Sequence, residues 1–161
     1  MSAPKGQTLQ QRLGFGDPEL STPQHDSIMM WLDSRMGTFV KENAPDPAEY
    51  EDGCEATLDK ISTTWERPIL SGKYMVGFAD LQVSTRWRID GPGRFYMDSL
   101  SFWFEVKPVI RSVGEVIRQI RMYQEYTEGE WFVVSPDTRW ADVLAAQNIG
   151  FVPVPSGVIG G

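Results

Sequence analysis

The sequence predicts an α/β protein: an α+β domain with a central mixed sheet and helices on both faces of that sheet. Two patterns indicate this fold class. A helical segment is followed by three strand-like segments joined by tight turns, and strand and helix patterns then alternate to the end of the chain. The length of 161 residues suits one domain and is short for two. We therefore expect a single domain over residues 22–155, an extended or weakly ordered arm at 1–21 and a flexible tail at 156–161.

The first predicted element is a helix. Thr22 is its capping residue, and Pro23 lies in its first turn. Its apolar residues recur at helical spacing until Pro45 ends the pattern; they are Ile28, Leu32, Met36, Phe39 and Val40. The following stretch, residues 42–59, holds seven carboxylates and no Lys or Arg. We interpret it as a solvated face or loop that includes a short helix within residues 48–59.

Three strands are expected next, over residues 61–70, 74–89 and 95–109, because these segments are rich in branched and aromatic residues. Turn-forming sequences around Gly72 and at residues 90–93 separate them. Connections this short join neighbouring antiparallel strands. The three segments should therefore form an antiparallel meander.

The second half of the domain alternates helix and strand. Ser112 and Glu115 have the spacing of a capping box and open a helix with apolar residues on one face. Residues 130–135 form a continuous apolar run, typical of a strand buried on both faces. A helix from Asp137 or Thr138 to Ala146 and a short strand at 151–154 complete the order helix, three strands, helix, strand, helix, strand.

Composition excludes several classes of protein. The mean hydropathy is −0.31, and the chain has no apolar run long enough for a membrane span. The first residues lack the apolar stretch of a secretory signal, and the single Cys54 cannot form an internal disulfide. We therefore expect a protein of the cytoplasm that does not enter the membrane. A catalytic thiol is disfavoured because His25 is the only imidazole that could activate it.

The net charge of −7 argues against nucleic-acid binding, but the charge is unevenly distributed. Residues 86–121 contain seven basic and four acidic residues, whereas the rest of the chain is strongly acidic. This local positive excess surrounds the candidate functional site described below. We expect phosphate contacts from its arginines, namely Arg86, Arg88, Arg111, Arg118 and Arg121.

A metal-dependent phosphodiesterase site is predicted from two adjacent strands. Glu105 and Lys107 are two residues apart and share one strand face, while the apolar residues between and before them face the other way. The hairpin at residues 90–93 folds Asp80 back near Glu105, because ten residues precede the turn and twelve follow it. Two adjacent carboxylates repel one another unless a cation holds them, and oxygen ligands suit magnesium or manganese.

The predicted roles follow from this layout. Asp80 and Glu105 bind the metal through their side chains, and the backbone carbonyl of Val106 adds a third ligand. Lys107 holds or helps to deprotonate the attacking water. Gln119 and Tyr123, four residues apart on the next helix, converge on the site, Gln119 orienting Lys107 or the substrate and Tyr123 reaching the phosphate backbone.

Each motif also has a plainer interpretation. A Glu-x-Lys on a strand is most often an exposed charge pair. An Asp three residues after a glycine is often a strand-end residue, and Tyr123 also fits the apolar face of its helix. What favours the functional interpretation is the occurrence of all three motifs in one order on the expected elements.

These motifs resemble those of the PD-(D/E)XK nuclease superfamily, and within it the RecB-like branch. The matching residues are Gly77-x-x-Asp80, Glu105-x-Lys107 and Gln119-x-x-x-Tyr123, together with an upstream Glu66-x-Pro68, and the resemblance covers residues 22–135. It implies a restriction-endonuclease-like core and a Mg- or Mn-dependent nuclease that acts on DNA more than on RNA. This chain departs from the family pattern in having Phe78-Ala79, with no proline, before Asp80.

The resemblance also raises two further expectations. Some RecB-like nucleases use a histidine of the first helix as an additional metal ligand, and His25 occupies that position here; the alternative is an exposed or capping histidine. The alternative function is a catalytically inactive nuclease-like fold that binds nucleic acid or serves assembly. In either case the chain is expected to form a homo-oligomer or to join a larger phage, plasmid or repair assembly.

Overall fold

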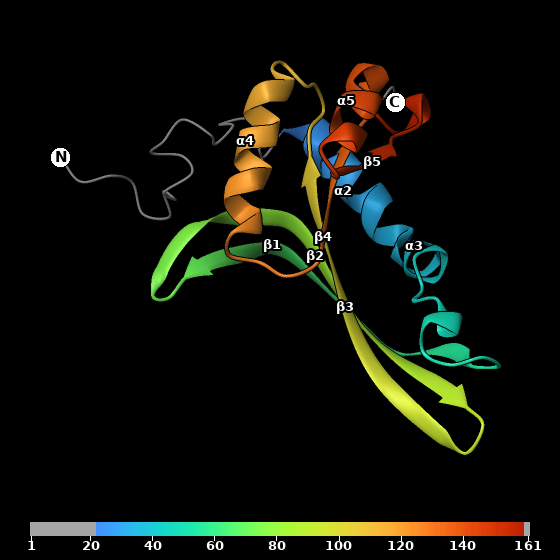
Figure 1. Cartoon of the computed structure of the whole chain (residues 1–161). Coiled ribbons are helices and arrows are strands. Elements are labelled where there is room, and N and C mark those ends of the chain that lie inside the picture. The colour runs from blue at the N-terminus through green and yellow to red at the C-terminus, as the bar shows by residue number, and fades with distance from the viewer. Residues whose placement is uncertain (1–21, 160–161) are drawn as a thin grey trace.

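The computed structural model describes residues 22–159, so the expected arm at residues 1–21 lies outside the described residues (Figure 1). Helices and strands follow the predicted order. None of the helices within residues 22–159 combines the length and apolar character that a membrane span requires. The elements are α2 (Pro23–Ser34), α3 (Met36–Glu42), η1 (Pro47–Glu49), β1 (Glu55–Ser71), β2 (Tyr74–Gly91), β3 (Arg94–Val106), α4 (Val113–Gln124), β4 (Glu130–Ser135), η2 (Thr138–Trp140), α5 (Ala141–Ala146), β5 (Gly150–Pro153) and η3 (Ser156–Val158).

The sheet has five strands in the order β1-β2-β3-β4-β5. Strands β1, β2 and β3 form the expected antiparallel meander, and β3, β4 and β5 run parallel to one another. The prediction of a mixed sheet is therefore confirmed. The parallel strands are joined by crossovers through α4 and α5, because parallel neighbours cannot be joined by a tight turn.

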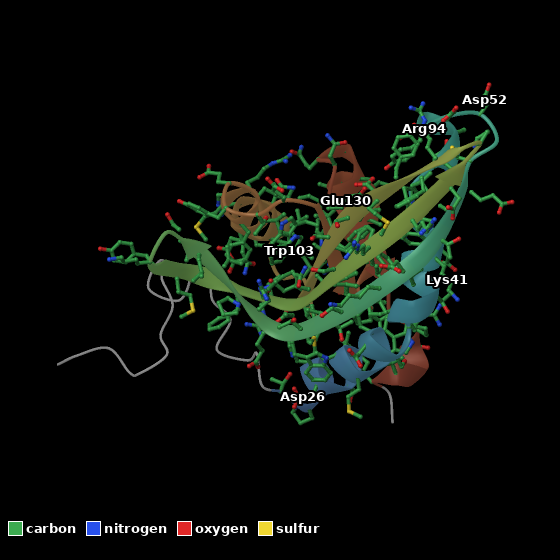
Figure 2. All side chains as sticks on the ribbon, turned by 90° about the horizontal axis from the view of Figure 1, so that it is seen from below. Asp26, Lys41, Asp52, Arg94, Trp103 and Glu130 are labelled. Carbon is green, nitrogen blue, oxygen red and sulfur yellow. The ribbon has the colours of Figure 1, made fainter. Side chains whose placement is uncertain are left out.

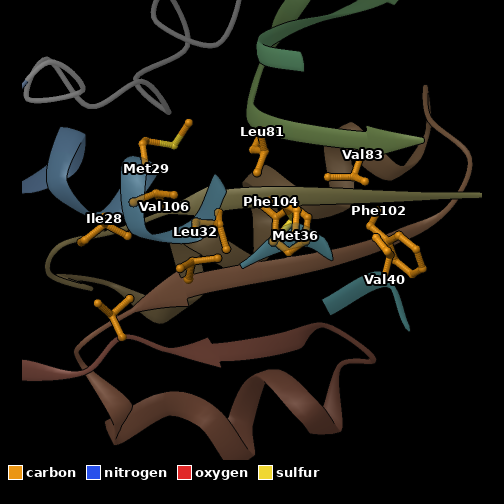
Figure 3. Packing of buried hydrophobic residues seen from close by; sticks show 12 residues of the cluster. Ile28, Met29, Leu32, Met36, Val40, Leu81, Val83, Phe102, Phe104 and Val106 are labelled. Carbon is orange, nitrogen blue, oxygen red and sulfur yellow. The ribbon is translucent and has the colours of Figure 1, made fainter. Parts of the chain in front are cut away.

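Helices cover both faces of the sheet, as predicted. On one face α2 and α3 pack their apolar residues against β2 and β3, and Figure 3 shows this cluster, with Leu32 and Met36 beside Phe104. On the other face α4 and α5 enclose a second cluster around Trp131 and Ile120. In Figure 1, α4 lies on the opposite side of β3 and β4 from α2 and α3. Consecutive residues of β3 and β4 thus point into different cores.

The first helix differs from the prediction because it is two helices separated at Arg35. The Ser34 hydroxyl donates a hydrogen bond back to the carbonyl of Trp31, at 2.6 Å, and so competes with the regular helix ladder. Gly37, which follows closely, has low helix propensity. The chain nevertheless resumes as α3, and both helices bury residues in the same core.

The acidic stretch also differs from the prediction. Only the 3₁₀ turn η1 forms there, with Asp46 accepting a hydrogen bond from the N–H of Ala48 at 3.0 Å. Strand β1 begins at Glu55, inside the stretch expected to be helical, and pairs with Asp90 near the β2–β3 turn. Strand β1 begins this early because β2 provides backbone hydrogen-bond partners along its whole length.

The chain end is ordered as far as the structure describes it. Residues 156–158 form η3, and Val158 and Ile159 pack against the core of α2 and α3. Residues 160–161 of the expected tail lie outside the described residues, and the flexibility of the tail stays a prediction.

Candidate functional site

The site forms where β2 separates from β3. The last hydrogen-bonded pair between these strands is Leu81–Phe104. The next pair in the same register would be Asp80 and Glu105. Asp80 is 7% exposed, and its Oδ2 accepts a hydrogen bond from the backbone N–H of Val106 at 2.7 Å. The hairpin therefore brings Asp80 beside Glu105, as the near-equal arm lengths predicted. The bond to Val106 could not be read from the sequence.

Glu105 is held through only one of its two oxygens. The residue is 1% exposed, and Oε1 lies 3.5 Å from Lys107 Nζ and accepts a hydrogen bond from Gln119 Nε2 at 3.4 Å. Among the residues that the structure describes, Oε2 has no hydrogen-bond partner although it is buried. A buried carboxylate oxygen without a partner is energetically costly, so it marks a position where a ligand would be stabilising.

Burial raises the pKa of Glu105 to about 8, and the neighbouring charge of Asp80 acts in the same direction. The ammonium of Lys107 and the amide of Gln119 oppose this rise. Without a cation, the carboxyl therefore holds its proton at neutral pH more readily than an ordinary glutamate. A divalent cation would favour the charged form of both carboxylates.

Lys107 is itself largely removed from solvent, with 8% of its surface exposed. Its backbone N–H donates to the carbonyl of Val134 at 2.9 Å, which fixes the residue just beyond the end of β3. An exposed charge pair, the plainer interpretation of Glu105 and Lys107, is therefore wrong. Burying an ammonium beside a carboxyl group costs desolvation energy, so fold stability alone does not account for this pair.

Helix α4 supplies the predicted Gln119 and Tyr123, both of which are buried. The amide of Gln119 lies 3.4 Å from the Tyr123 hydroxyl as well as from Glu105. Tyr123 has no exposed surface and stacks on Trp131, with ring centroids 5.3 Å apart. Burial raises the pKa of Tyr123, so its hydroxyl stays protonated. Tyr123 therefore lies in the core, as its plainer interpretation had it, and it cannot reach a phosphate directly.

Gly77 has a packing role that the motif spacing did not reveal. A Cβ built at this position would lie 2.6 Å from Cε1 of Tyr123, well inside van der Waals contact. The ring that would be displaced is buried and held by its stacking on Trp131. The glycine of the Gly77-x-x-Asp80 motif thus lets α4 approach β2 and carry Gln119 to Glu105.

We expect Gly77→Ala to destabilise the fold by about 1–3 kcal/mol, because overpacking a buried site forces side chains or backbone to move. Urea denaturation measures this change. The matched control is Gly37→Ala, where an added Cβ meets nothing within 4 Å on a helix, so its stability should stay equal or rise. Equal stability of Gly77→Ala and the wild type would show that the ring of Tyr123 moves freely.

His25 lies on α2 and contacts the opposite side of Asp80. Its Nε2 is 3.2 Å from Asp80 Oδ1, and the residue is 6% exposed. Burial lowers the pKa of His25, but the contact with Asp80 and the charge of Asp26 outweigh it, so the pKa is raised overall. The plainer interpretation, an exposed or capping histidine, is wrong. The imidazole thus lies against one of the two predicted metal-binding carboxylates, and a role for His25 as a metal ligand stays a prediction.

The two arginines of β2 lie away from the site. Arg86 faces Ser99 across the ladder, and Ser99 is six residues from Glu105, which is roughly 20 Å along a strand. Arg88 is two residues farther. Each guanidinium Nε lies near a carboxylate of the same chain, at 3.6 and 2.8 Å. The linear charge cluster is therefore spread along the β2–β3 arm.

The other three arginines lie at or near α4, and all are exposed. Arg118 directly precedes Gln119 on the helix, and Arg111 lies in the loop before it. Arg121 donates hydrogen bonds to the carbonyl and the side-chain oxygen of Gln147, at 2.9 and 2.8 Å. Arg121 therefore anchors α4 to the end of α5, and phosphate contacts from Arg111 and Arg118 stay a prediction.

The donor set fits a partial site for Mg²⁺ or Mn²⁺. Within residues 22–159, no three His, Cys, Asp or Glu side chains converge closely enough to form a metal site by themselves. Asp80 and Glu105 provide carboxylate oxygen donors, and Oε2 of Glu105 has no hydrogen-bond partner in the described part of the chain. Mg²⁺ is commonly held by one or two carboxylates, with water and substrate oxygens filling the other positions. The residues present therefore fit such an ion.

Comparisons of this chain with protein-family models, with curated proteins and with solved structures found no match. The family resemblance of the motifs therefore remains a prediction.

Proposed function

We propose that this protein is a metal-dependent nuclease that hydrolyses phosphodiester bonds of nucleic acid, with DNA as the preferred substrate. The observation that carries the proposal is the buried Glu105. One of its oxygens is held by Lys107 and Gln119, the other has no hydrogen-bond partner within residues 22–159, and the carboxylate of Asp80 is its neighbour.

In this proposal Asp80 and Glu105 hold Mg²⁺ or Mn²⁺, with the carbonyl of Val106 as a further donor. The bound ion supplies Lewis acidity and a water acidic enough to attack at neutral pH. The chain's own residues orient these groups. The N–H of Val106 and the imidazole of His25 fix the two oxygens of Asp80, and Gln119 fixes Oε1 of Glu105.

Lys107 is the residue that meets the reacting groups. Its ammonium is bound to Glu105 and almost excluded from bulk water, so its charge acts in a medium of low dielectric constant. There it positions the attacking water and offsets the charge that develops on the phosphate. Tyr123 serves as a positioning residue through Gln119.

The direct test is a cleavage assay on the full chain. Single-stranded, double-stranded and branched DNA and RNA are incubated with Mg²⁺, Mn²⁺ or EDTA, using the wild type, Asp80→Asn and the control Asp52→Asn. Asp52 is exposed at the tip of the molecule (Figure 2). We expect metal-dependent cleavage by the wild type and by Asp52→Asn. Absence of cleavage on every substrate, or full activity of Asp80→Asn, would contradict the proposal and favour a binding or assembly protein.

A further inference from the structure

Strand β1 is an edge strand with seventeen residues, and within residues 22–159 no strand pairs with its outer side. It pairs with β2 only, and among the described residues no other strand adds to it. Residues 59–63 and 65–68 are exposed. A long open edge offers unpaired backbone donors and acceptors to another chain, and proteins normally cover or blunt such an edge.

The centre of this edge is well suited to pairing. Residues 61–65 are Ile-Ser-Thr-Thr-Trp, with no charge, no proline and no glycine. The side chains of Ile61 and Trp65 are 38% and 45% exposed. The ladder with β2 shifts between Leu58 and Lys60 and then keeps one register from Lys60 to Ile69, although the backbone has a positive φ at Glu66. Residues 60–65 thus form a regular strand segment.

The sequence of this segment is self-complementary about Thr63. Two charged residues of opposite sign precede the uncharged centre, Asp59 and Lys60, and two of opposite sign follow it, Glu66 and Arg67. The order of signs is the same on both sides. A strand that meets a second copy of itself in the antiparallel sense therefore meets opposite charges at both ends.

We propose that β1 pairs with β1 of a second copy of this chain, antiparallel and centred on Thr63, to form a two-fold symmetric dimer with a continuous sheet. Lys60 then faces Glu66 of the second copy, and Asp59 faces Arg67. Nearer the axis Ile61 faces Trp65, an aromatic and β-branched pair that is favourable across strands. Ser62 faces Thr64, and Thr63 lies on the axis.

The charges select this arrangement over its competitors. A parallel, in-register pair would set Lys60 against Lys60 and Glu66 against Glu66, which is unfavourable. A slip of one residue would place Ile61 of one copy and Trp65 of the other on opposite faces of the joint sheet. The Trp65 indole is held on the face that carries α2 by a hydrogen bond to Asp33 Oδ1 at 3.1 Å.

This proposed pairing of β1 does not depend on the proposed nuclease activity.

Sedimentation equilibrium of the full chain at several protein concentrations tests this dimer. We expect the wild type to reach twice the 18.2 kDa of the chain. Lys60→Glu and Glu66→Lys should each weaken the dimer at least tenfold, because each sets two pairs of like charges across the axis. The double variant Lys60→Glu/Glu66→Lys should regain the wild-type mass.

A mixture provides a second test that does not depend on the double variant. The two single variants are complementary to each other, so mixing them in equal amounts should give a heterodimer although each alone is a monomer. Three results would overturn the proposal: a wild type that stays at 18.2 kDa at the highest concentration, single variants that dimerise as well as the wild type, or a mixture that stays monomeric. A monomeric wild type would mean that the edge of β1 does not bind a second copy of this chain.

Discussion

Lys107→Met is expected to lower the rate of metal-dependent cleavage roughly 10²–10⁴-fold, the usual range for loss of a group that assists proton transfer. Methionine keeps the apolar stem and removes the ammonium that lies 3.5 Å from Glu105. The two carboxylates proposed to hold the metal remain, so Mn²⁺ should still bind. Single-turnover rates at saturating Mn²⁺ measure the loss without interference from product release.

Lys41→Met is the matched control, because Lys41 is an exposed lysine on α3 with no contact to the site (Figure 2). The control should cleave at the wild-type rate. A Lys107→Met variant that also cleaves at the wild-type rate would remove Lys107 from the mechanism. A thermal melt of both variants separates loss of catalysis from loss of folding.

Glu105→Gln is expected to change how the stability of the metal-free protein depends on pH. Burial raises the pKa of Glu105 to about 8, above an unfolded value of about 4.3, so the folded state binds the proton more tightly. The contribution of this group to the free energy of unfolding is fully present below a pH of about 4.3, and it is lost as the pH rises to about 8. The slope is at most about 1.4 kcal/mol per pH unit.

The substitution removes this loss because glutamine stays neutral. In EDTA, the wild type should therefore be less stable than Glu105→Gln at pH 8, with the difference shrinking toward pH 5. Urea midpoints at the two pH values measure this. The raised pKa of His25 acts in the same direction in both proteins, so it cancels in the comparison.

The control for this prediction is Glu130→Gln, since Glu130 is an exposed carboxylate on β4 (Figure 2). Its pH profile should follow that of the wild type. If Glu105→Gln shows the same profile as the wild type, then Glu105 is already ionised in the folded metal-free protein. Manganese should raise the stability of the wild type at pH 8 and leave Glu105→Gln nearly unchanged.

Much of the fold could be predicted because its strongest signals are local. The turns at Gly72 and at residues 90–93, the proline after Thr22 and the serine cap at Ser112 fix where elements begin or end. The first part of β1 could not be predicted. Residues 55–59 do alternate polar and apolar side chains, but the run is short and lies within the acidic stretch, so the length of the strand depends on its partner β2.

The site could be predicted as a set of residues, but not as a structure. Order and spacing brought Asp80, Glu105, Lys107 and Gln119 together correctly. The fit of Gly77 against the Tyr123 ring depends on how α4 packs on β2, which no local pattern encodes. Similarly, a linear cluster of arginines does not reveal which face or end of the sheet each one occupies.

Direct measurement of Mn²⁺ binding tests the central claim that Asp80 and Glu105 share one divalent ion. Isothermal titration of the full chain at pH 8 should give one Mn²⁺ per chain in the wild type and in Asp52→Asn. Binding should be lost in Asp80→Asn and in Glu105→Gln, because each removes one of the two charged oxygen ligands. Absence of binding by the wild type, or unchanged binding by either variant, would contradict the assignment of this site.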